Sequence, residues 1–222
     1  MTTLLSLFHR CHAALNHTRI ADFLAPLALR LFLAPVMFSA GYNKAMSFES
    51  TVSWFGNSEW GLGLPFPALL AFLATATELV GGVLLLLGLF TRYISIPLMF
   101  TMLVAIGTVH WGNGWFAIAP GNPATSMAAP LAEVGFPGAA ESLQNSEAVG
   151  ERLGRARAIL REHGQYDWLT GKGNFVVLNN GIEFAVTYLV MLLVLFFSGA
   201  GRFVSLDYWI ARRCWARARS NV

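Results

Sequence analysis

The sequence predicts an all-α protein: a four-helix transmembrane bundle with an interfacial amphipathic helix at each terminus. Three observations predict this class. Hydrophobic residues make up 55% of the 222-residue chain and charged residues only 12%, against about 25% in soluble domains. Four apolar runs approach the roughly 20 residues that a helix needs to cross a bilayer. Arginines are frequent near both chain ends and also occur between the second and third runs.

The four apolar runs are the predicted spans. They cover about residues 23–41, 68–90, 93–110 and 182–201. Asp22 precedes the first run and suits the N-cap of a helix. Pro97 lies in the first turns of the third run, where its missing N–H costs little.

The long connection of residues 111–180 predicts a partly helical outer loop between spans three and four. Apolar residues recur at helical spacing from Leu143 to Leu160, and Glu151 and Arg155 are spaced for an ion pair on one helix face. The segment is too short to bury a core of its own. We therefore expect residues 1–222 to form a single membrane domain.

Both termini have the pattern of helices that lie in the membrane plane. Phe8 and Leu15 share one helical stripe near the N-terminus, and Leu206 and Ile210 oppose a cluster of arginines in the tail. Such helices bury their apolar face among lipids and direct arginines toward anionic headgroups. Membrane lipid is thus the first predicted partner.

The placement of arginines predicts the orientation of the spans. Arg10, Arg19, Arg92 and the arginines of the tail all fall on one side of a four-span arrangement. Because cytoplasmic loops carry an excess of Lys and Arg, we expect a multi-pass protein with both termini in the cytoplasm.

Glu78 lies in the middle of the second run, where an unpaired charge costs at least about 2.5–3.5 kcal/mol. Such a group faces the protein interior and has a partner. At about 1.5 Å per residue, the depths of Arg30 in the first span and Glu78 differ by roughly 7 Å. The sequence therefore predicts a structural ion pair between Arg30 and Glu78.

Three further ionisable residues map to the outer ends of the spans. Lys44 ends the first, His110 ends the third and Glu183 opens the fourth. With Arg30 and Glu78 they are the predicted lining of a polar pocket for a headgroup, a quinone or a small polar substrate. The alternative is structural: the buried charges only determine how the helices pack, and Lys44 is a snorkelling anchor.

The sequence lacks the residues that several classes of function need. Cys11 and Cys214 lie near opposite chain ends and no second histidine accompanies His110 in a span, so no disulfide framework or metal site is predicted. A net charge of +3 is small for a nucleic-acid partner. No nucleotide-binding or hydrolase motif occurs. Catalytic residues stay unassigned, and we expect no cofactor in the chain itself beyond a bound quinone or lipid.

Four features of the sequence form a familiar pattern: Arg30, the GYNK turn of Gly41–Lys44, the string E-x-x-G-G…G-L-x-T-R within Ala76–Arg92, and an acidic residue near the start of the last span. In these features the chain resembles the DoxX family of small, four-helix bacterial inner-membrane proteins. The resemblance covers about residues 24–110 and the last span. It implies the bacterial inner (plasma) membrane and a partner protein in a redox complex or in maturation of copper-binding peptides.

Three functions follow as hypotheses. The first is an accessory subunit of a membrane redox system whose pocket binds a quinone or lipid-like ligand. The second is a membrane scaffold or assembly factor whose buried charges only pack the bundle. The third, ranked lowest because no inverted repeat is visible, is proton-coupled small-molecule transport.

Overall fold

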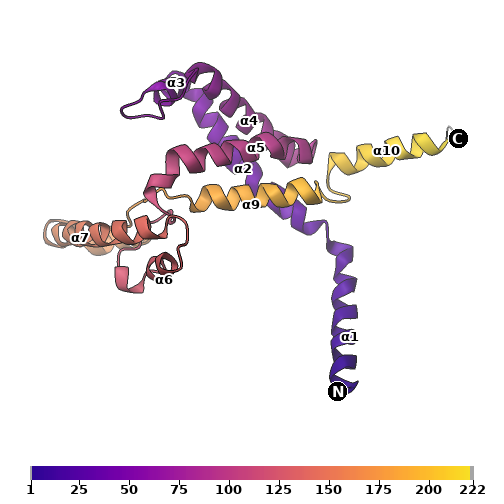
Figure 1. Ribbon diagram of the computed structural model, residues 1–222, viewed down its shortest axis with the longest axis horizontal. Coiled ribbons are helices and arrows are strands. Elements are labelled where there is room, and N and C mark those ends of the chain that lie inside the picture. Colours follow the sequence, from indigo (N-terminus) through magenta and orange to yellow (C-terminus); the bar gives the residue numbers. More distant parts are fainter. Residues whose placement is uncertain (1, 221–222) are drawn as a thin grey trace. The chain divides into compact units, whose positions relative to one another are not determined.

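The computed structural model describes residues 2–220, which are mostly helical (Figure 1). Within these residues no strand occurs, and one isolated antiparallel bridge joins Ile118 to Leu178. The predicted all-α class is confirmed.

The chain divides into two compact units. The first comprises Met1–Thr101 and Leu189–Val222, and the second comprises Met102–Tyr188. The boundaries between them fall inside helices α5 (Thr91–Ala105) and α9 (Glu183–Ser198). The single membrane domain predicted over residues 1–222 stays a prediction.

Among its described residues, the first unit contains six further helical elements, including two long apolar helices. In chain order they are α1 (Thr2–His17), a 3-10 turn (Thr18–Ala21), α2 (Leu24–Met46), α3 (Phe48–Gly56), α4 (Pro67–Leu87) and α10 (Leu206–Ser220). Helices α1 and α10 are therefore present where the sequence predicts terminal helices, and their position in the headgroup plane stays a prediction.

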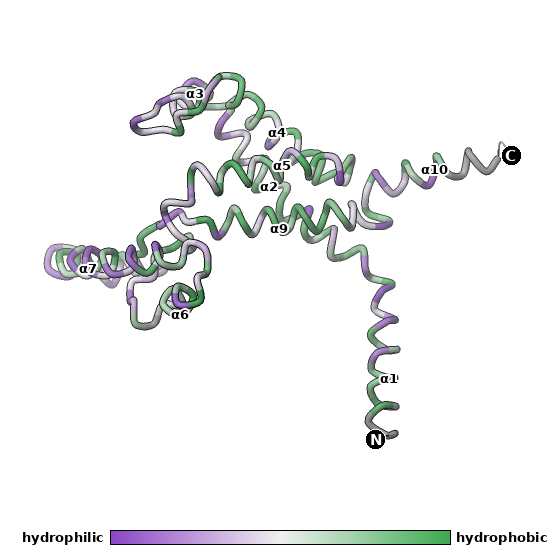
Figure 2. The backbone as a smooth tube through the Cα atoms, viewed as in Figure 1, coloured by the Kyte–Doolittle hydropathy of each residue, from purple (hydrophilic) through white to green (hydrophobic). Residues whose placement is uncertain are grey.

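The second unit holds the segment predicted as an outer loop. It contains a π-helical turn (Ile106–His110), 3-10 turns (Trp111–Asn113 and Pro123–Thr125) and helices α6 (Ala128–Glu133), α7 (Ala139–His163) and α8 (Tyr166–Thr170). Helix α6 packs against α7, and the Trp115 and Phe136 rings meet edge to face with centroids 4.6 Å apart. Helix α7 carries hydrophilic residues along much of its length (Figure 2).

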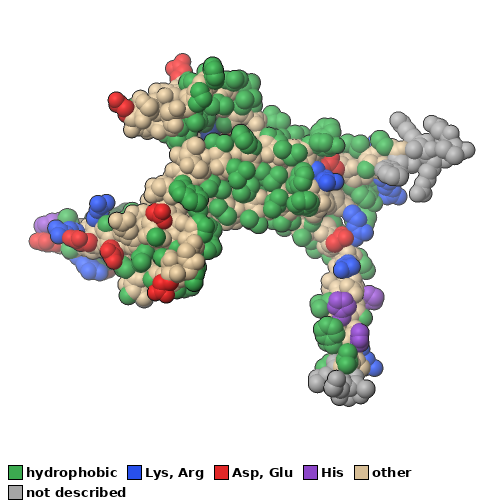
Figure 3. Space-filling model, in the orientation of Figure 1, with side chains coloured by type: hydrophobic (Ala, Val, Ile, Leu, Met, Phe, Trp, Pro, Cys, Tyr) green, Lys and Arg blue, Asp and Glu red, His purple; other side chains and the backbone are tan. Residues whose placement is uncertain are grey.

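Three helices are long and apolar enough to cross a membrane: Leu24–Met46, Pro67–Leu87 and Thr91–Asn113. They correspond to the first three predicted spans. Helix α9 is equally apolar but has only 16 residues, because glycines with positive φ, Gly199 and Gly201, follow its last turn. The fourth span, and with it the four-helix transmembrane bundle, stays a prediction. Hydrophobic side chains cover the visible face of α4 and α5 (Figure 3).

Helices α2 and α4 pack closely because glycines lie between their backbones. A Cβ atom at Gly82 would lie 2.7 Å from the amide nitrogen of Phe38, and one at Gly41 would lie 2.5 Å from that of Leu79. Small residues at such positions let membrane helices approach each other. The resulting antiparallel register determines which charged side chains of the two helices can meet.

Candidate functional site

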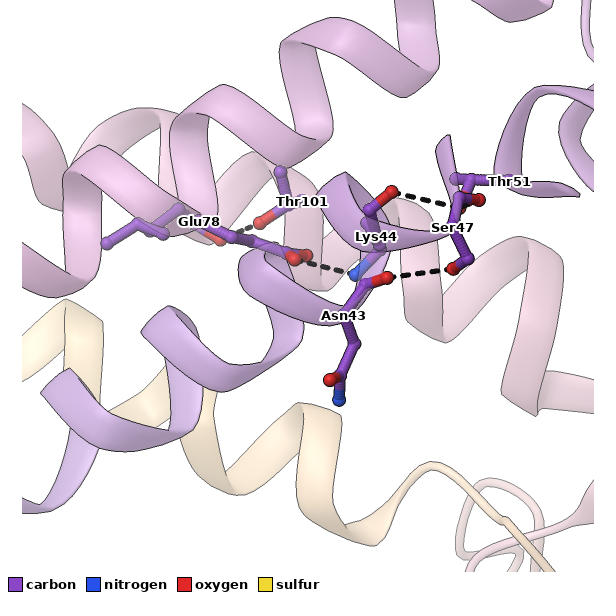
Figure 4. A network of polar contacts seen from close by, with 7 residues as sticks. Asn43, Lys44, Ser47, Thr51, Glu78 and Thr101 are labelled. Carbon is purple, nitrogen blue, oxygen red and sulfur yellow. Dashed lines mark hydrogen bonds and ion pairs between the residues drawn. The ribbon is translucent and has the colours of Figure 1, made fainter. Parts of the chain in front are cut away.

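The carboxylate of Glu78 pairs with Lys44. The Lys44 Nζ donates to Glu78 Oε2 at 2.6 Å, with 7% of the Glu78 side chain and 26% of the Lys44 side chain exposed. Figure 4 shows Lys44, from the last turns of α2, pointing toward Glu78 in the middle of α4. Because α2 continues to Met46, beyond the predicted end at residue 41, Lys44 belongs to the helix itself.

Two buried threonines lie near the residues of this ion pair. Thr75 lies on α4 one turn before Glu78, is 6% exposed, and its Oγ1 has no hydrogen-bond partner among the described residues. Residues three apart on a helix are neighbours on one face. Thr51 of α3 donates to the carbonyl oxygens of Ser47 at 3.0 Å and Lys44 at 3.5 Å. Within the described part of the chain, the Thr75 hydroxyl is therefore an unused donor one helical turn from a partly buried ion pair.

Arg30 is stabilised in a different way, by hydrogen bonds to the backbone. Its guanidinium is 1% exposed and donates only to backbone carbonyls in the described residues. Nε donates to Leu85 O at 2.7 Å, Nη2 to Leu86 O at 2.9 Å and Nη1 to Ala200 O at 2.7 Å, and both terminal nitrogens approach Val204 O. The last carbonyls of a helix lack partners within the helix, so Arg30 joins α2 to the end of α4 and to the α9–α10 turn.

The turn after α4 is shaped to admit this guanidinium. Gly88 has φ +62°, and Leu89 N donates to Leu84 O while Gly88 N donates to Leu85 O, which is the Schellman pattern of a helix end. A Cβ atom at Gly88 would lie 2.5 Å from the Arg30 Cζ. The glycine therefore supplies both the left-handed conformation and the space for Arg30.

Asp207, at the start of α10, closes the same turn from the other side. Its Oδ1 accepts from Phe90 N at 2.7 Å and its Oδ2 from Thr91 N at 2.9 Å, and its own N–H donates to Gly88 O at 2.9 Å. The carboxylate thus caps the N-terminus of α5. Sequence reasoning missed Asp207 because the amide that it caps is 117 residues away; it also missed Thr75, whose burial only packing reveals.

The predicted ion pair of Arg30 and Glu78 is wrong. The register of α2 and α4 places Arg30 opposite Leu85 and Leu86, two turns or roughly 10 Å along α4 from Glu78. Backbone carbonyls in the last turn of α4 accept from the arginine, and Lys44 reaches the glutamate. The prediction failed because it ended the first helix at residue 41 and did not consider the carbonyls at the end of α4 as acceptors.

His110 and Glu183 belong to the second unit, whereas Arg30, Lys44 and Glu78 belong to the first. The His110 Nδ1 lies 2.7 Å from Asn180 O, and Glu183 Oε2 accepts from Ala117 N at 2.9 Å. Both side chains therefore bind the backbone of loops within the second unit. A single pocket lined by all five residues stays a prediction.

The chemistry available at the Lys44–Glu78 site is hydrogen bonding to an acceptor. An ammonium group has three donors and a threonine hydroxyl has one, while Glu78 neutralises the positive charge. Among the described residues no group of three or more His, Cys, Asp or Glu side chains is arranged to hold a metal ion.

Comparisons with known proteins identify one family and two relatives. The DoxX family model matches residues 25–111, a region that contains Arg30, Lys44, Glu78 and His110. The chain is 36% identical over 83 residues to the Bacillus subtilis protein named "Putative oxidoreductase CatD", which covers 37% of this chain and 58% of that protein. It is 30% identical over 113 residues to the Escherichia coli "Inner membrane protein YphA", covering 48% of this chain and 78% of that protein.

The match to YphA covers most of that protein, whereas the chain spans little more than half the length of CatD. No solved structure matches this chain. The family model, these relatives and the three apolar helices lead to one conclusion: the chain belongs to the DoxX family of membrane proteins.

Proposed function

We propose that this protein is an accessory subunit of a bacterial inner-membrane redox system and binds a quinone or a lipid-like molecule beside Lys44, Glu78 and Thr75. The observation that carries the proposal is the Thr75 hydroxyl, which is buried without a hydrogen-bond partner among the described residues, one turn from a partly buried ion pair. Leaving a buried donor unsatisfied costs about 1–3 kcal/mol. A ligand with an acceptor oxygen would remove that cost.

The three side chains have complementary roles in this proposal. Thr75 and Lys44 donate to a carbonyl oxygen or an anionic head of the ligand, and Glu78 holds the ammonium in place. The 26% exposure of the Lys44 side chain supplies the access that a ligand needs. No residue is assigned a catalytic role: electrons would pass between the bound quinone and a cofactor of a partner protein. The name of CatD as an oxidoreductase supports a redox setting.

The change Thr75→Val tests this proposal and leaves the ion pair of Lys44 and Glu78 intact. It removes the unpaired hydroxyl while keeping the side-chain shape, so the detergent melting temperature should be unchanged or slightly higher. The quinone retained after gentle extraction, measured by mass spectrometry of the organic extract, should fall by about fivefold, since a net hydrogen bond is worth about 1 kcal/mol.

The matched control is Thr187→Val on α9, whose exposed hydroxyl donates to Glu183 O within its own helix. It should leave quinone retention unchanged. Equal retention in Thr75→Val and the unaltered protein, or no quinone in either, would contradict the proposal.

A second candidate is a scaffold or assembly factor, and the Arg30 contacts favour it. One buried side chain joins α2, the end of α4 and the α9–α10 turn, entirely through the backbone. A scaffold needs such rigid connections and no ligand. Extraction that yields a partner protein but never a quinone would favour this function over the first.

A further inference from the structure

An open cleft of about 420 Å³ lies in the first unit where α1 ends and α2 begins. Its floor and walls come from the segment around the 3-10 turn Thr18–Ala21 and from the α9–α10 turn. The residues that matter for its chemistry are His17, Arg19, Ile20, Asp22, Arg202 and Phe203, with Asn16 beside them.

The two turns are held together by an ion pair on one side of the cleft. The Nε and Nη2 of Arg202 donate to Asp22 Oδ1 at 3.0 and 2.7 Å, and Nη2 also donates to Arg19 O at 3.2 Å. Among the described residues that line the cleft, Asp22 has the only carboxylate, and Arg202 neutralises it.

The second arginine is left uncompensated. The guanidinium of Arg19 is exposed and makes no hydrogen bond or ion pair within the described part of the chain. The formal charges of Arg19, Arg202 and Asp22 leave the cleft with one net positive charge when His17 is neutral. An anion is the ligand that this charge favours, and arginine binds phosphate oxygens in a forked geometry.

Apolar side chains lie beside this cation. Ile20 is 78% exposed and Phe203 is 47% exposed, and Leu24, the first residue of a helix long enough to span a membrane, is 53% exposed. A small hydrophilic anion gains nothing from these surfaces, whereas a molecule with an anionic head and acyl chains buries them. The cation and the apolar flank together are complementary to the headgroup region of an anionic phospholipid.

We propose that this cleft binds the phosphate of an anionic phospholipid, with Arg19 on the phosphate oxygens and Ile20 and Phe203 against the glycerol and upper acyl chain. The ligand chemistry is a phosphate anion, and the apolar flank selects the lipid over free phosphate. The site is separate from Lys44, Glu78 and Thr75 and does not depend on the function proposed for them.

The test measures binding of short-chain phosphatidylglycerol to the full-length protein in a neutral detergent, beside phosphatidylcholine of equal chain length and inorganic phosphate. Arg19→Gln should weaken phosphatidylglycerol binding about tenfold, as expected for loss of a charge-assisted hydrogen bond. Arg10→Gln on α1 removes the same charge outside the cleft lining and should change binding less than about twofold, because exposed charges are screened over about 10 Å.

Ile20→Ser separates the two sources of phosphate. It should weaken phosphatidylglycerol binding and leave the weaker binding of inorganic phosphate unchanged, and folding should tolerate it because Ile20 is 78% exposed. Equal losses in Arg19→Gln and Arg10→Gln would overturn the proposal in favour of general surface charge. Inorganic phosphate that binds as tightly as the lipid would overturn the lipid assignment.

Discussion

The guanidinium of Arg30 and the carboxylate of Glu78 lie on the same pair of helices but are stabilised by different partners. Arginine has five N–H donors in a fixed fork, and the end of α4 with the nearby α9–α10 turn offers four carbonyl oxygens within reach. A cation at the C-terminus of a helix also interacts favourably with the helix dipole. The glutamate needs one cation, and Lys44 supplies it.

At the residue scale, Gly88→Ala should destabilise the protein by about 1–3 kcal/mol, since an alanine at φ +62° is strained. The added methyl group would also displace the Arg30 guanidinium, which lies 2.5 Å from its position. The measurement is thermal unfolding in detergent. Gly154→Ala, in α7 where an added Cβ meets nothing within 4 Å, should instead raise stability by up to about 1 kcal/mol. Equal effects of both changes would contradict this role of Gly88.

At the element scale, the approach of α2 to α4 depends on glycines whose added Cβ atoms would collide with backbone. Side-chain ends can move to accommodate a methyl group, whereas the backbone of a helix cannot move without shifting the whole element. Gly81 and Gly82 are adjacent in sequence but face different neighbours: Gly82 faces the backbone of α2, and Gly81 faces the Leu98 side chain of α5.

Gly82→Ala should therefore be the more damaging of two adjacent substitutions. Its Cβ would lie 2.7 Å from Phe38 N and 2.9 Å from Ala34 O, and overpacking of this kind costs about 1–3 kcal/mol. Gly81→Ala would meet Leu98 side-chain carbons at 2.9–3.1 Å, which a rotamer change can relieve. Comparative melting curves in one detergent distinguish them, and a larger loss in Gly81→Ala would refute the assigned α2–α4 contact.

At the scale of the whole molecule, the number of membrane crossings decides where the two chain ends lie. Three helices are long enough to span and α9 is shorter. Four crossings place Cys11 and Cys214, both exposed and unpaired, on the same side of the membrane. Three crossings place them on opposite sides.

We predict four crossings with both cysteines in the cytoplasm. A membrane-impermeant maleimide should then label neither cysteine in intact spheroplasts and both in inverted vesicles. Glu147→Cys, at an exposed position of α7 in a variant lacking Cys11 and Cys214, is the control and should react in spheroplasts. Labelling of only one native cysteine from outside would establish an odd number of crossings.

The sequence alone predicted the helical class, the membrane location and the DoxX resemblance, because the length and polarity of an apolar run are local properties. It also singled out Glu78 as a charge that needs a partner, with Arg30 as the predicted partner and Lys44 as a pocket residue or an interfacial anchor. The sequence alone could not predict which of these charged residues pair with each other. Depth along a helix can be estimated from residue counts, but the register between two helices is set by where their glycines let the backbones meet.

What the sequence by itself determined is therefore that buried charges exist on α2 and α4, since the hydrophobic surroundings make an unpaired charge costly. Only the tertiary structure decided the partners: Lys44 for Glu78, helix-end carbonyls for Arg30, and Asp207 for the start of α5. The physical reason is that backbone carbonyl and amide groups at helix ends are acceptors and donors as strong as many side chains, and a residue list does not show where they lie.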